Sequence, residues 1–235
     1  MKNPSELTVR LDRGTGAATT ALVYAALEPR VGAALILGHG AGAGQRSTFM
    51  VDFARALSAM GADVITFNFL YAEQQRRIPD RAPALEACYR AVIDAVRAEV
   101  ESARRFLFIG GKSMGGRIAT QVAAADPDLD LAGLVLLGYP LHPPGRPEQR
   151  RDKHLPAIAR PMLFVQGNRD AFGTPAELTP VLRAQQPAPV LHVVESGDHS
   201  FKLSRKDPAA QAAVYAEVQR AIIGFIVQTS HGGQR

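Results

Sequence analysis

The sequence predicts an α/β protein whose central sheet is mostly parallel and covered by helices on both faces. Short continuous apolar runs, typical of strands buried on both faces, alternate with stretches that have helical spacing. The composition, with 46% hydrophobic and 21% charged residues, is that of an ordinary globular chain. We therefore expect a single domain over residues 1–235, with a flexible tail over about 228–235.

The individual elements follow from the local patterns. Residues 7–11 and 20–25 alternate with period two, and the turn-rich segment 12–16 between them predicts a hairpin or meander. Buried strands are predicted at 33–37, 64–69, 106–109, 134–137, 162–165 and 190–194. Helices are predicted at 49–60, 84–100, 118–125, 176–183 and 209–226. Residues 139–160 contain five prolines and no regular period, which is typical of a functional or mobile loop.

Composition excludes several classes of protein. The 27 basic and 22 acidic residues give a net charge of +5, but the basic residues are scattered along the chain. With no Trp and 6% aromatic residues, no nucleic-acid-binding module is recognisable. No apolar run reaches the ~18 residues of a membrane span, and the N-terminus lacks the apolar stretch of a signal peptide. The single cysteine, Cys88, excludes a disulfide framework. We expect a cytoplasmic protein that binds neither nucleic acid nor membrane; a homo-oligomer is compatible with the sequence.

Residues 111–116, GKSMGG, give the strongest local signal of chemistry. They contain G-x-S-x-G directly after a predicted strand and open a predicted helix, which is the context of a nucleophile elbow. Such a turn requires glycines because the backbone is strained and passes close to neighbouring strands. A phosphate-binding loop would need glycine at Phe106, so that interpretation is excluded. We expect Ser113 to be a nucleophile.

The glycine-rich run 38–44, GHGAGAG, follows another predicted strand. It does not fit a dinucleotide fingerprint, because the required glycines would fall at Ala43 or Gln45. In an elbow architecture such a loop supplies one backbone N–H to the oxyanion hole, and the residue after the nucleophile supplies the other. We expect Ala41 and Met114 to donate these N–H groups, with Gly40 and Gly42 shaping the loop beside the substrate.

An acid and a base are expected after the nucleophile, in the chain order Ser, Asp or Glu, His. Asp170 follows the strand 162–165, and His199 follows the strand 190–194. Because parallel strands end at one edge of the sheet, Ser113, Asp170 and His199 can meet there. Asp198 is the rival acid, but it adjoins His199 in the chain and could not easily reach Nδ1. The other five histidines are His39, His142, His154, His192 and His231.

These segments together resemble α/β-hydrolases, in particular small bacterial hydrolases of the KANL/Tex-type and dienelactone-hydrolase-like families. The resemblance extends over about residues 31–201 and rests on 39–42 (HGAG), 67–69 (FNF), 111–116 (GKSMGG), 167–170 (GNRD) and 197–199 (GDH). It implies the α/β-hydrolase fold. Dienelactone hydrolases proper use a cysteine nucleophile, whereas this chain has Ser113. Eukaryotic relatives include a chromatin-complex subunit that resembles a scaffold.

Two loops are expected to shape specificity. Residues 71–81 leave the catalytic edge of the sheet, and we expect Tyr71, Arg76 and Arg77 to bind substrate, the arginines favouring an anionic one. Residues 139–160 stand where larger hydrolases insert a cap; here the insertion is short, so the cap is minimal. If this loop also rims the cleft, its Arg146, Arg150, Arg151 and Lys153 add to the positive charge that attracts an anionic substrate. Both segments could equally be solvated connections.

The sequence is therefore interpreted as a serine hydrolase of carboxylic esters or thioesters that forms an acyl-enzyme and needs no cofactor or metal. The alternative is a non-catalytic interaction scaffold that kept the fold.

Overall fold

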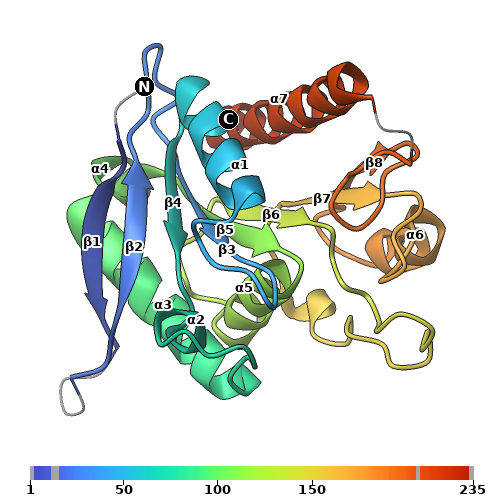
Figure 1. Ribbon diagram of the computed structural model, residues 1–235, viewed down its shortest axis with the longest axis horizontal. Coiled ribbons are helices and arrows are strands. Elements are labelled where there is room, and N and C mark those ends of the chain that lie inside the picture. The colour runs from blue at the N-terminus through green and yellow to red at the C-terminus, as the bar shows by residue number, and fades with distance from the viewer. Residues whose placement is uncertain (1–2, 12–15, 205–206, 233–235) are drawn as a thin grey trace.

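The computed structural model describes residues 3–11, 16–204 and 207–232. Within these ranges, eight strands form one sheet (Figure 1). The strands are β1 Ser5–Arg10, β2 Ala18–Tyr24, β3 Ala34–Gly38, β4 Asp63–Phe67, β5 Leu107–Lys112, β6 Gly133–Leu137, β7 Met162–Gly167 and β8 Val190–Val194. Each strand overlaps a predicted one. The apolar runs of β3 to β7 are buried almost throughout, whereas the prediction of a buried strand at 190–194 is wrong: β8 lies at the sheet edge and only its Val194 is buried.

The order of strands in the sheet is β1-β2-β4-β3-β5-β6-β7-β8. The first two strands pair antiparallel with each other, and β2 also runs antiparallel to β4. All neighbours from β4 to β8 are parallel. The predicted hairpin is therefore present, although residues 12–15 of its turn lie outside the described residues. Because β3 to β8 all run in one direction, the loops after β3, β5, β7 and β8 leave from one edge of the sheet.

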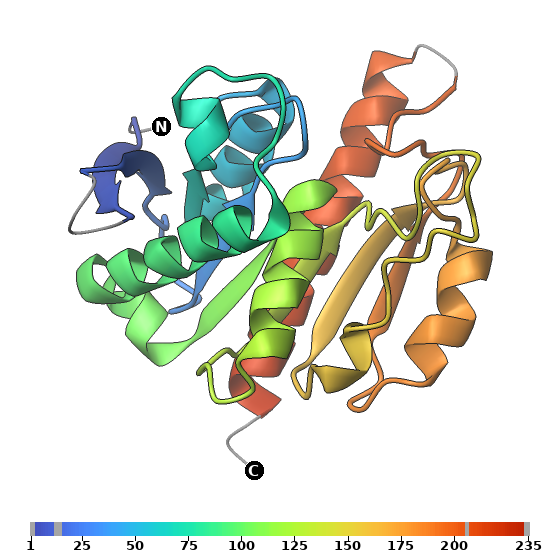
Figure 2. The same ribbon diagram turned by 90° about the horizontal axis from the view of Figure 1, so that it is seen from below.

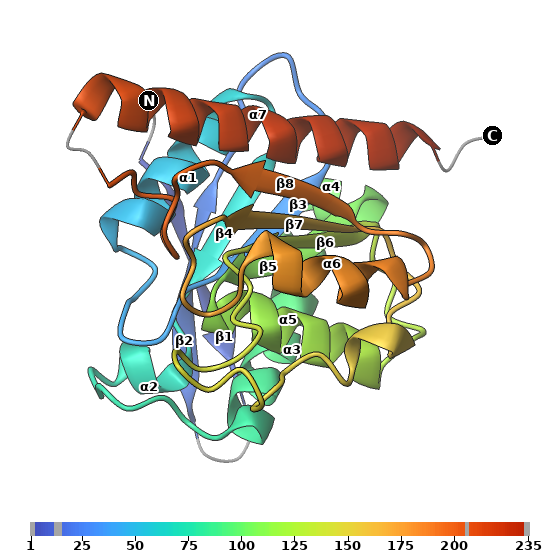
Figure 3. The same cartoon turned by 90° about the vertical axis from the view of Figure 1, so that its right-hand side faces the viewer.

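Helices cover both faces of the sheet, as expected. The helices are α1 Thr48–Ala59, α2 Leu70–Glu73, α3 Ala82–Glu99, α4 Glu101–Arg105, α5 Met114–Ala125, α6 Pro175–Arg183 and α7 Pro208–Gly232, with a 3-10 turn at Leu155–Ala157. One face carries α1 and α7, and the opposite face carries α3, α5 and α6 (Figure 3). Figure 2 shows α3 in green, α5 in yellow-green and α6 in orange spread across the second face.

Alternation along the strands divides the apolar side chains into two cores. In β3, Ala34 and Ile36 pack on the α3–α5 side, whereas Leu35 and Leu37 pack against α1 and α7. All four are fully buried. A strand that packs against helices on both faces of the sheet needs apolar residues at every position. Such strands therefore appear in the sequence as unbroken apolar runs.

Several boundaries differ from the sequence-based expectation. The helices α2 and α4, with 4 and 5 residues, are too short to show a helical period, and they were not predicted. The helix predicted at 118–125 begins at Met114, immediately after the elbow serine. The last helix continues to Gly232 with Ser230 buried, so residues 228–232, expected in the tail, are helical. Residues 233–235 lie outside the described ranges.

No helix in the described part of the chain is both long and apolar enough to cross a membrane.

Candidate active site

Ser113 stands in the turn between β5 and α5, at the centre of the sheet. Its backbone has φ 52° and ψ −114°, a conformation that non-glycine residues rarely adopt. The turn is held by hydrogen bonds from the Ser113 N–H to the Leu137 carbonyl, at 2.9 Å, and from the Arg117 N–H to the Ser113 carbonyl, at 3.0 Å. The strained turn lifts the hydroxyl out of the sheet edge.

Glycines make this turn possible because it touches the neighbouring strand. A Cβ at Gly115 would lie 2.1 Å from the Gly38 carbonyl oxygen, and one at Gly111 would lie 2.3 Å from the same atom. Both distances are far shorter than any real contact, so neither position accepts a side chain without displacing β3. The glycines predicted from the motif are therefore required by packing.

The structure brings together the three residues that were expected to act together. The distance from Ser113 Oγ to His199 Nε2 is 2.8 Å, and the distance from His199 Nδ1 to Asp170 Oδ2 is also 2.8 Å. The Asp170 side chain is fully buried, whereas the His199 ring is 22% exposed. These side chains come from the loops after β5, β7 and β8, which leave the same edge of the sheet.

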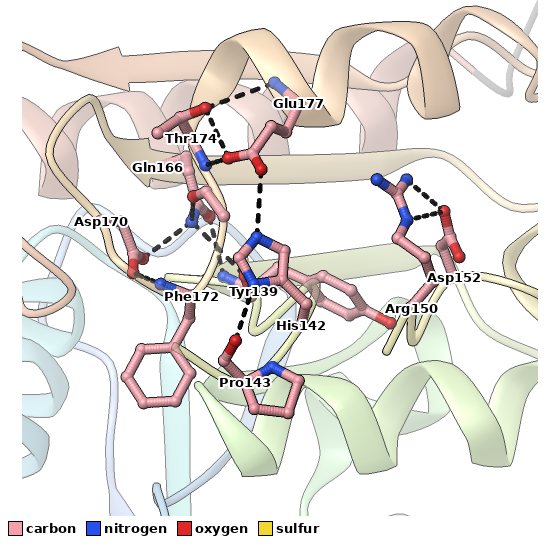
Figure 4. Close-up of polar contacts among 11 residues, drawn as sticks. Tyr139, His142, Pro143, Arg150, Asp152, Gln166, Asp170, Phe172, Thr174 and Glu177 are labelled. Atoms are coloured by element: carbon pink, nitrogen blue, oxygen red, sulfur yellow. Dashed lines mark hydrogen bonds and ion pairs between the residues drawn. The ribbon is translucent and has the colours of Figure 1, made fainter. Parts of the chain in front are cut away.

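Gln166, in β7, fixes the orientation of Asp170. Its Nε2 donates to Asp170 Oδ2 at 2.8 Å and to the Gly173 carbonyl at 2.6 Å, while its Oε1 accepts from the Tyr139 N–H at 2.8 Å. Figure 4 shows this amide between the carboxylate and the Tyr139 backbone. The Phe172 N–H donates to the other carboxylate oxygen at 2.8 Å. Asp170 therefore has a partner for each oxygen besides His199.

Gln166 and Phe172 were not identified from the sequence. The Phe172 ring lies against the His199 imidazole, with 4.2 Å between centroids and a 30° tilt, and it shields one side of that ring from solvent. Gln166 did leave a signal, since it is the one amide side chain in an otherwise apolar strand. A fully buried amide needs hydrogen-bond partners, and here they are the Asp170 carboxylate and the backbone around it.

Asp198, the rival acid, has a structural role in the turn after β8. Its Oδ1 accepts the N–H groups of Ser200 at 2.7 Å and Lys202 at 2.9 Å. This carboxylate makes no hydrogen bond to His199 among the described residues. The other histidines contact different groups: His142 with Glu177, His154 with Thr120, His192 with Glu217, and His231 with the Val227 carbonyl.

The loop after β3 lies against the serine. A Cβ at Gly40 would stand 3.6 Å from Ser113 Cβ, and a turn bond joins the Ala43 N–H to the Gly40 carbonyl at 3.2 Å. Ala41 and Met114 line the same cavity as Ser113. Met114 is the first residue of α5, where backbone N–H groups have no helical carbonyl to bond.

His39 fastens this loop to the end of β4. Its Nε2 accepts the Phe69 N–H at 3.2 Å, so its Nδ1–H donates to the Gly40 carbonyl at 2.8 Å. Burial lowers the pKa of His39, which favours this neutral form. His39 was expected only as a member of the loop; the structure adds this anchoring contact.

Lys112, the residue before the serine, is a buried cation. Burial lowers its pKa to about 8, although the charges of Asp170 and Asp198 oppose that shift. Its Nζ has no hydrogen-bond partner among the described residues and lies 5.9 Å from the centre of the Phe49 ring. The site thus places a third ionisable group beside the Asp170 carboxylate.

A cavity of about 560 Å³ opens beside Ser113. Of the residues expected to bind substrate, Gly40 lines it, whereas Gly42, Tyr71, Arg76 and Arg77 do not. Its wall includes the charged and aromatic side chains of Asp80, Lys112, Arg117, Arg151, Phe172 and His199.

The arginines of the 71–81 loop that were expected to bind substrate do not line this cavity. Arg76 is 45% exposed and pairs with Asp80 at 2.8 Å, and Arg77 is exposed. Tyr71 is buried, with its ring 5.9 Å from that of His39. A pair of arginines in the sequence shows that a loop is positively charged, but it does not show whether either side chain reaches the cavity.

Cys88 is buried in α3, and burial raises the pKa of its thiol to about 12, as expected for a packed core cysteine. Within the described ranges, no group of three or more His, Cys, Asp or Glu side chains is arranged to hold a metal ion.

Comparison with known proteins agrees with this architecture. Residues 31–227 match the family described as an alpha/beta hydrolase domain. The structure is similar to an alpha-beta serine hydrolase homologue from Coxiella burnetii, with a TM-score of 0.73 and 16% identity over 95% of this chain and 98% of that one. It is also similar to a dienelactone hydrolase from Anabaena variabilis, with a TM-score of 0.70 and 18% identity over 95% and 99% of the two chains.

A third similar structure is a serine hydrolase without a lid from Xanthomonas campestris, with a TM-score of 0.66 and 21% identity over 94% and 96% of the two chains. At these identities the likeness establishes a common fold, and the expected resemblance is confirmed at that level. The narrower KANL/Tex-type assignment stays a prediction.

Proposed function

The chain belongs to the α/β-hydrolase family, and we propose that it is a serine hydrolase that cleaves carboxylic esters or thioesters through an acyl-enzyme on Ser113. The observation that carries this proposal is the continuous hydrogen-bonded series from Ser113 through His199 to Asp170. A hydroxyl, an imidazole and a buried carboxylate in this order form an activated nucleophile.

Acylation uses each of these groups. Ser113 Oγ attacks the substrate carbonyl while His199 Nε2 takes the hydroxyl proton, and Asp170 holds the ring in the tautomer that leaves Nε2 free. The backbone N–H groups of Ala41 and Met114 donate to the oxyanion of the tetrahedral intermediate. When the intermediate collapses, His199 gives its proton to the departing alcohol or thiol.

Deacylation repeats these steps with water. His199 removes a proton from a water molecule, whose oxygen attacks the acyl carbon of the ester on Ser113. The collapse of this second intermediate releases the carboxylic acid and returns the proton to Ser113 Oγ.

The strain at Ser113 supports catalysis over a scaffold role. A non-glycine residue with positive φ in this region costs about 1–3 kcal/mol, which a protein without turnover has no reason to retain. The cavity volume of about 560 Å³ falls in the range of small-molecule sites and supports a small acyl substrate.

The test is a panel of esters and thioesters of increasing acyl length, assayed with the wild-type chain and with Ser113→Ala. We expect the wild type to hydrolyse at least part of the panel and the variant to show only background. Absence of hydrolysis across the whole panel would favour the scaffold alternative.

A further inference from the structure

Two arginines line the cavity beside Ser113 without a carboxylate partner. Arg117 lies in the first turns of α5, four residues after the serine, and it lines the same cavity as Ser113. Arg151 reaches the cavity from the loop between β6 and β7. Neither guanidinium forms an ion pair within the described part of the chain.

The backbones that carry these arginines are well fixed. The Arg117 N–H donates to the Ser113 carbonyl. The Arg151 N–H donates to the Leu141 carbonyl at 2.9 Å, and its carbonyl accepts the Tyr139 hydroxyl at 2.6 Å. Their side chains make few hydrogen bonds. The Arg117 guanidinium donates one long bond of 3.4 Å, to Gln121 Oε1. No hydrogen bond to the Arg151 guanidinium occurs among the described residues.

The two positive charges act on each other. Burial and the charge of Arg151 both lower the pKa of Arg117, and the charge of Glu86 only partly opposes this. Like charges held close together in a half-buried cavity are unfavourable unless an anion compensates them. The two guanidinium groups are therefore only partly compensated by acidic groups in the described structure.

The acidic groups around the cavity do not neutralise these two arginines either. Asp80 is its one lining carboxylate among the described residues, and Arg76 already pairs with it. Asp152, next to Arg151 in the chain, pairs with Arg150 at 2.5 Å (Figure 4). Lys112 adds a further cation to the wall. The lining is thus electropositive on the side of Arg117 and Arg151.

We propose that Arg117 and Arg151 form a subsite for an oxyanion at the far end of the substrate, which is an ester or thioester carrying a carboxylate or a phosphate. This inference rests on the proposed hydrolase function and narrows its substrate class. Guanidinium groups bind both anions through paired N–H donors, so the subsite orients the substrate as well as attracting it. Arg117 and Arg151 thus take the role of binding the anionic group that was expected for Arg76 and Arg77.

The experiment compares pairs of activated esters of equal length. One member carries a terminal carboxylate, as in monoesters of dicarboxylic acids of increasing chain length, and the other carries the neutral amide. A second series carries a terminal phosphate in place of the carboxylate. The readout is the ratio of kcat/KM for the anionic and neutral members, because a general loss of activity cancels in that ratio.

The variants are Arg117→Gln and Arg151→Gln, with Arg150→Gln as the matched control. Arg150 adjoins Arg151, has the same charge, and is paired with Asp152 outside the cavity lining. We expect the wild-type ratio to exceed one for at least one anion and to fall about ten- to hundredfold in each subsite variant, as for the loss of a charged hydrogen-bond partner. Circular dichroism checks that each variant folds.

The anion with the larger wild-type ratio identifies the substrate group. A wild-type ratio of one for both anions overturns the subsite, as does an equal fall in Arg150→Gln and the two subsite variants. Either result leaves the hydrolase proposal standing as long as the neutral esters are cleaved. If no ester of either kind is cleaved, the proposed function itself fails.

Discussion

Asp170 is a fully buried carboxylate whose hydrogen bonds fix the orientation of the site. Gln166 Nε2 and the Phe172 N–H donate to its oxygens, and the carboxylate in turn orients His199. A carboxylate in this position must accept from the imidazole Nδ1–H, because that bond selects the tautomer with Nε2 free. An amide of the same shape can present a donor instead and invert the tautomer. The residue is therefore sensitive to a change of one atom.

We expect Asp170→Asn to keep the fold and to lower kcat by about 10⁴. Asp198→Asn is the matched control, because the amide oxygen can still accept the Ser200 and Lys202 N–H groups. Steady-state kinetics on both variants provide the measurement. A nearly wild-type Asp170→Asn together with an inactive Asp198→Asn would show that the acid is misassigned.

Lys112 is a second residue whose burial has a measurable consequence. Its pKa falls from 10.5 to about 8, so between these values the unfolded chain binds more protons than the folded chain. The contribution of Lys112 to the free energy of unfolding therefore rises as the pH increases from about 8 to 10.5. Below about pH 8 the buried lysine is ionised and destabilises the fold. At about 1.4 kcal/mol per pKa unit, the penalty is roughly 3 kcal/mol at most.

Lys112→Met should accordingly raise the free energy of unfolding near neutral pH, and the gain should shrink as the pH approaches 10.5. Denaturant titrations at about pH 7 and about pH 10 measure this difference. Lys153→Met, at an exposed lysine, should change stability little at either pH. An equal gain for Lys112→Met at both pH values would contradict the burial argument.

At the scale of elements, the site depends on how closely α5 approaches β3. The first turn of α5 rests on the Gly38 backbone through Gly115, and this contact sets the height of Ser113 above the sheet edge. Any side chain at Gly115 must push the helix and the strand apart. Nucleophile geometry and helix packing are thus coupled at one position.

We expect Gly115→Ala to destabilise the fold by about 3 kcal/mol, the upper end of overpacking costs. Gly224→Ala is the control, because a Cβ on this exposed glycine of α7 would meet no neighbouring atom within 4 Å. That change should instead stabilise the fold by about 1 kcal/mol and raise Tm by roughly 2–4 °C. Thermal unfolding of both variants checks the contrast, and a stable Gly115→Ala would disprove the tight contact.

The elements themselves were largely predictable because their signals are local. Apolar runs marked β3 to β8, and the GKSMGG segment at 111–116 marked the junction of β5 with α5. What the sequence did not reveal depends on side-chain direction. Arg76 and Arg77 were expected at the substrate but do not line the cavity, and of the four basic residues expected at the rim from 139–160 only Arg151 lines it. Arg117 reaches the cavity from α5 without any local pattern that distinguishes it.

The partners of Asp170 illustrate the same limit. Asp170 and His199 were identified because they follow strands at one sheet edge, a property of order along the chain. Gln166 also bonds the Tyr139 backbone, which follows β6, and Phe172 packs on His199, which follows β8. These contacts form only after β6, β7 and β8 are placed side by side. Such contacts depend on tertiary packing, so periodicity and motif spacing do not report them.

At the scale of the whole molecule, one parallel sheet assembles the site from distant segments. Ser113 and His199 are 86 residues apart in the chain, and the common direction of β5, β7 and β8 brings their loops to one edge. Two apolar cores hold that edge rigid from both faces. The central claim is that this edge activates one particular hydroxyl.

The most direct test is labelling of the purified chain with a fluorophosphonate, followed by peptide mass spectrometry. We predict one label per chain, located on Ser113, lost in Ser113→Ala and strongly slowed in Asp170→Asn because the imidazole no longer activates the hydroxyl. Labelling that persists undiminished in Ser113→Ala, or an unlabelled Ser113 in the folded wild type, would contradict this assignment.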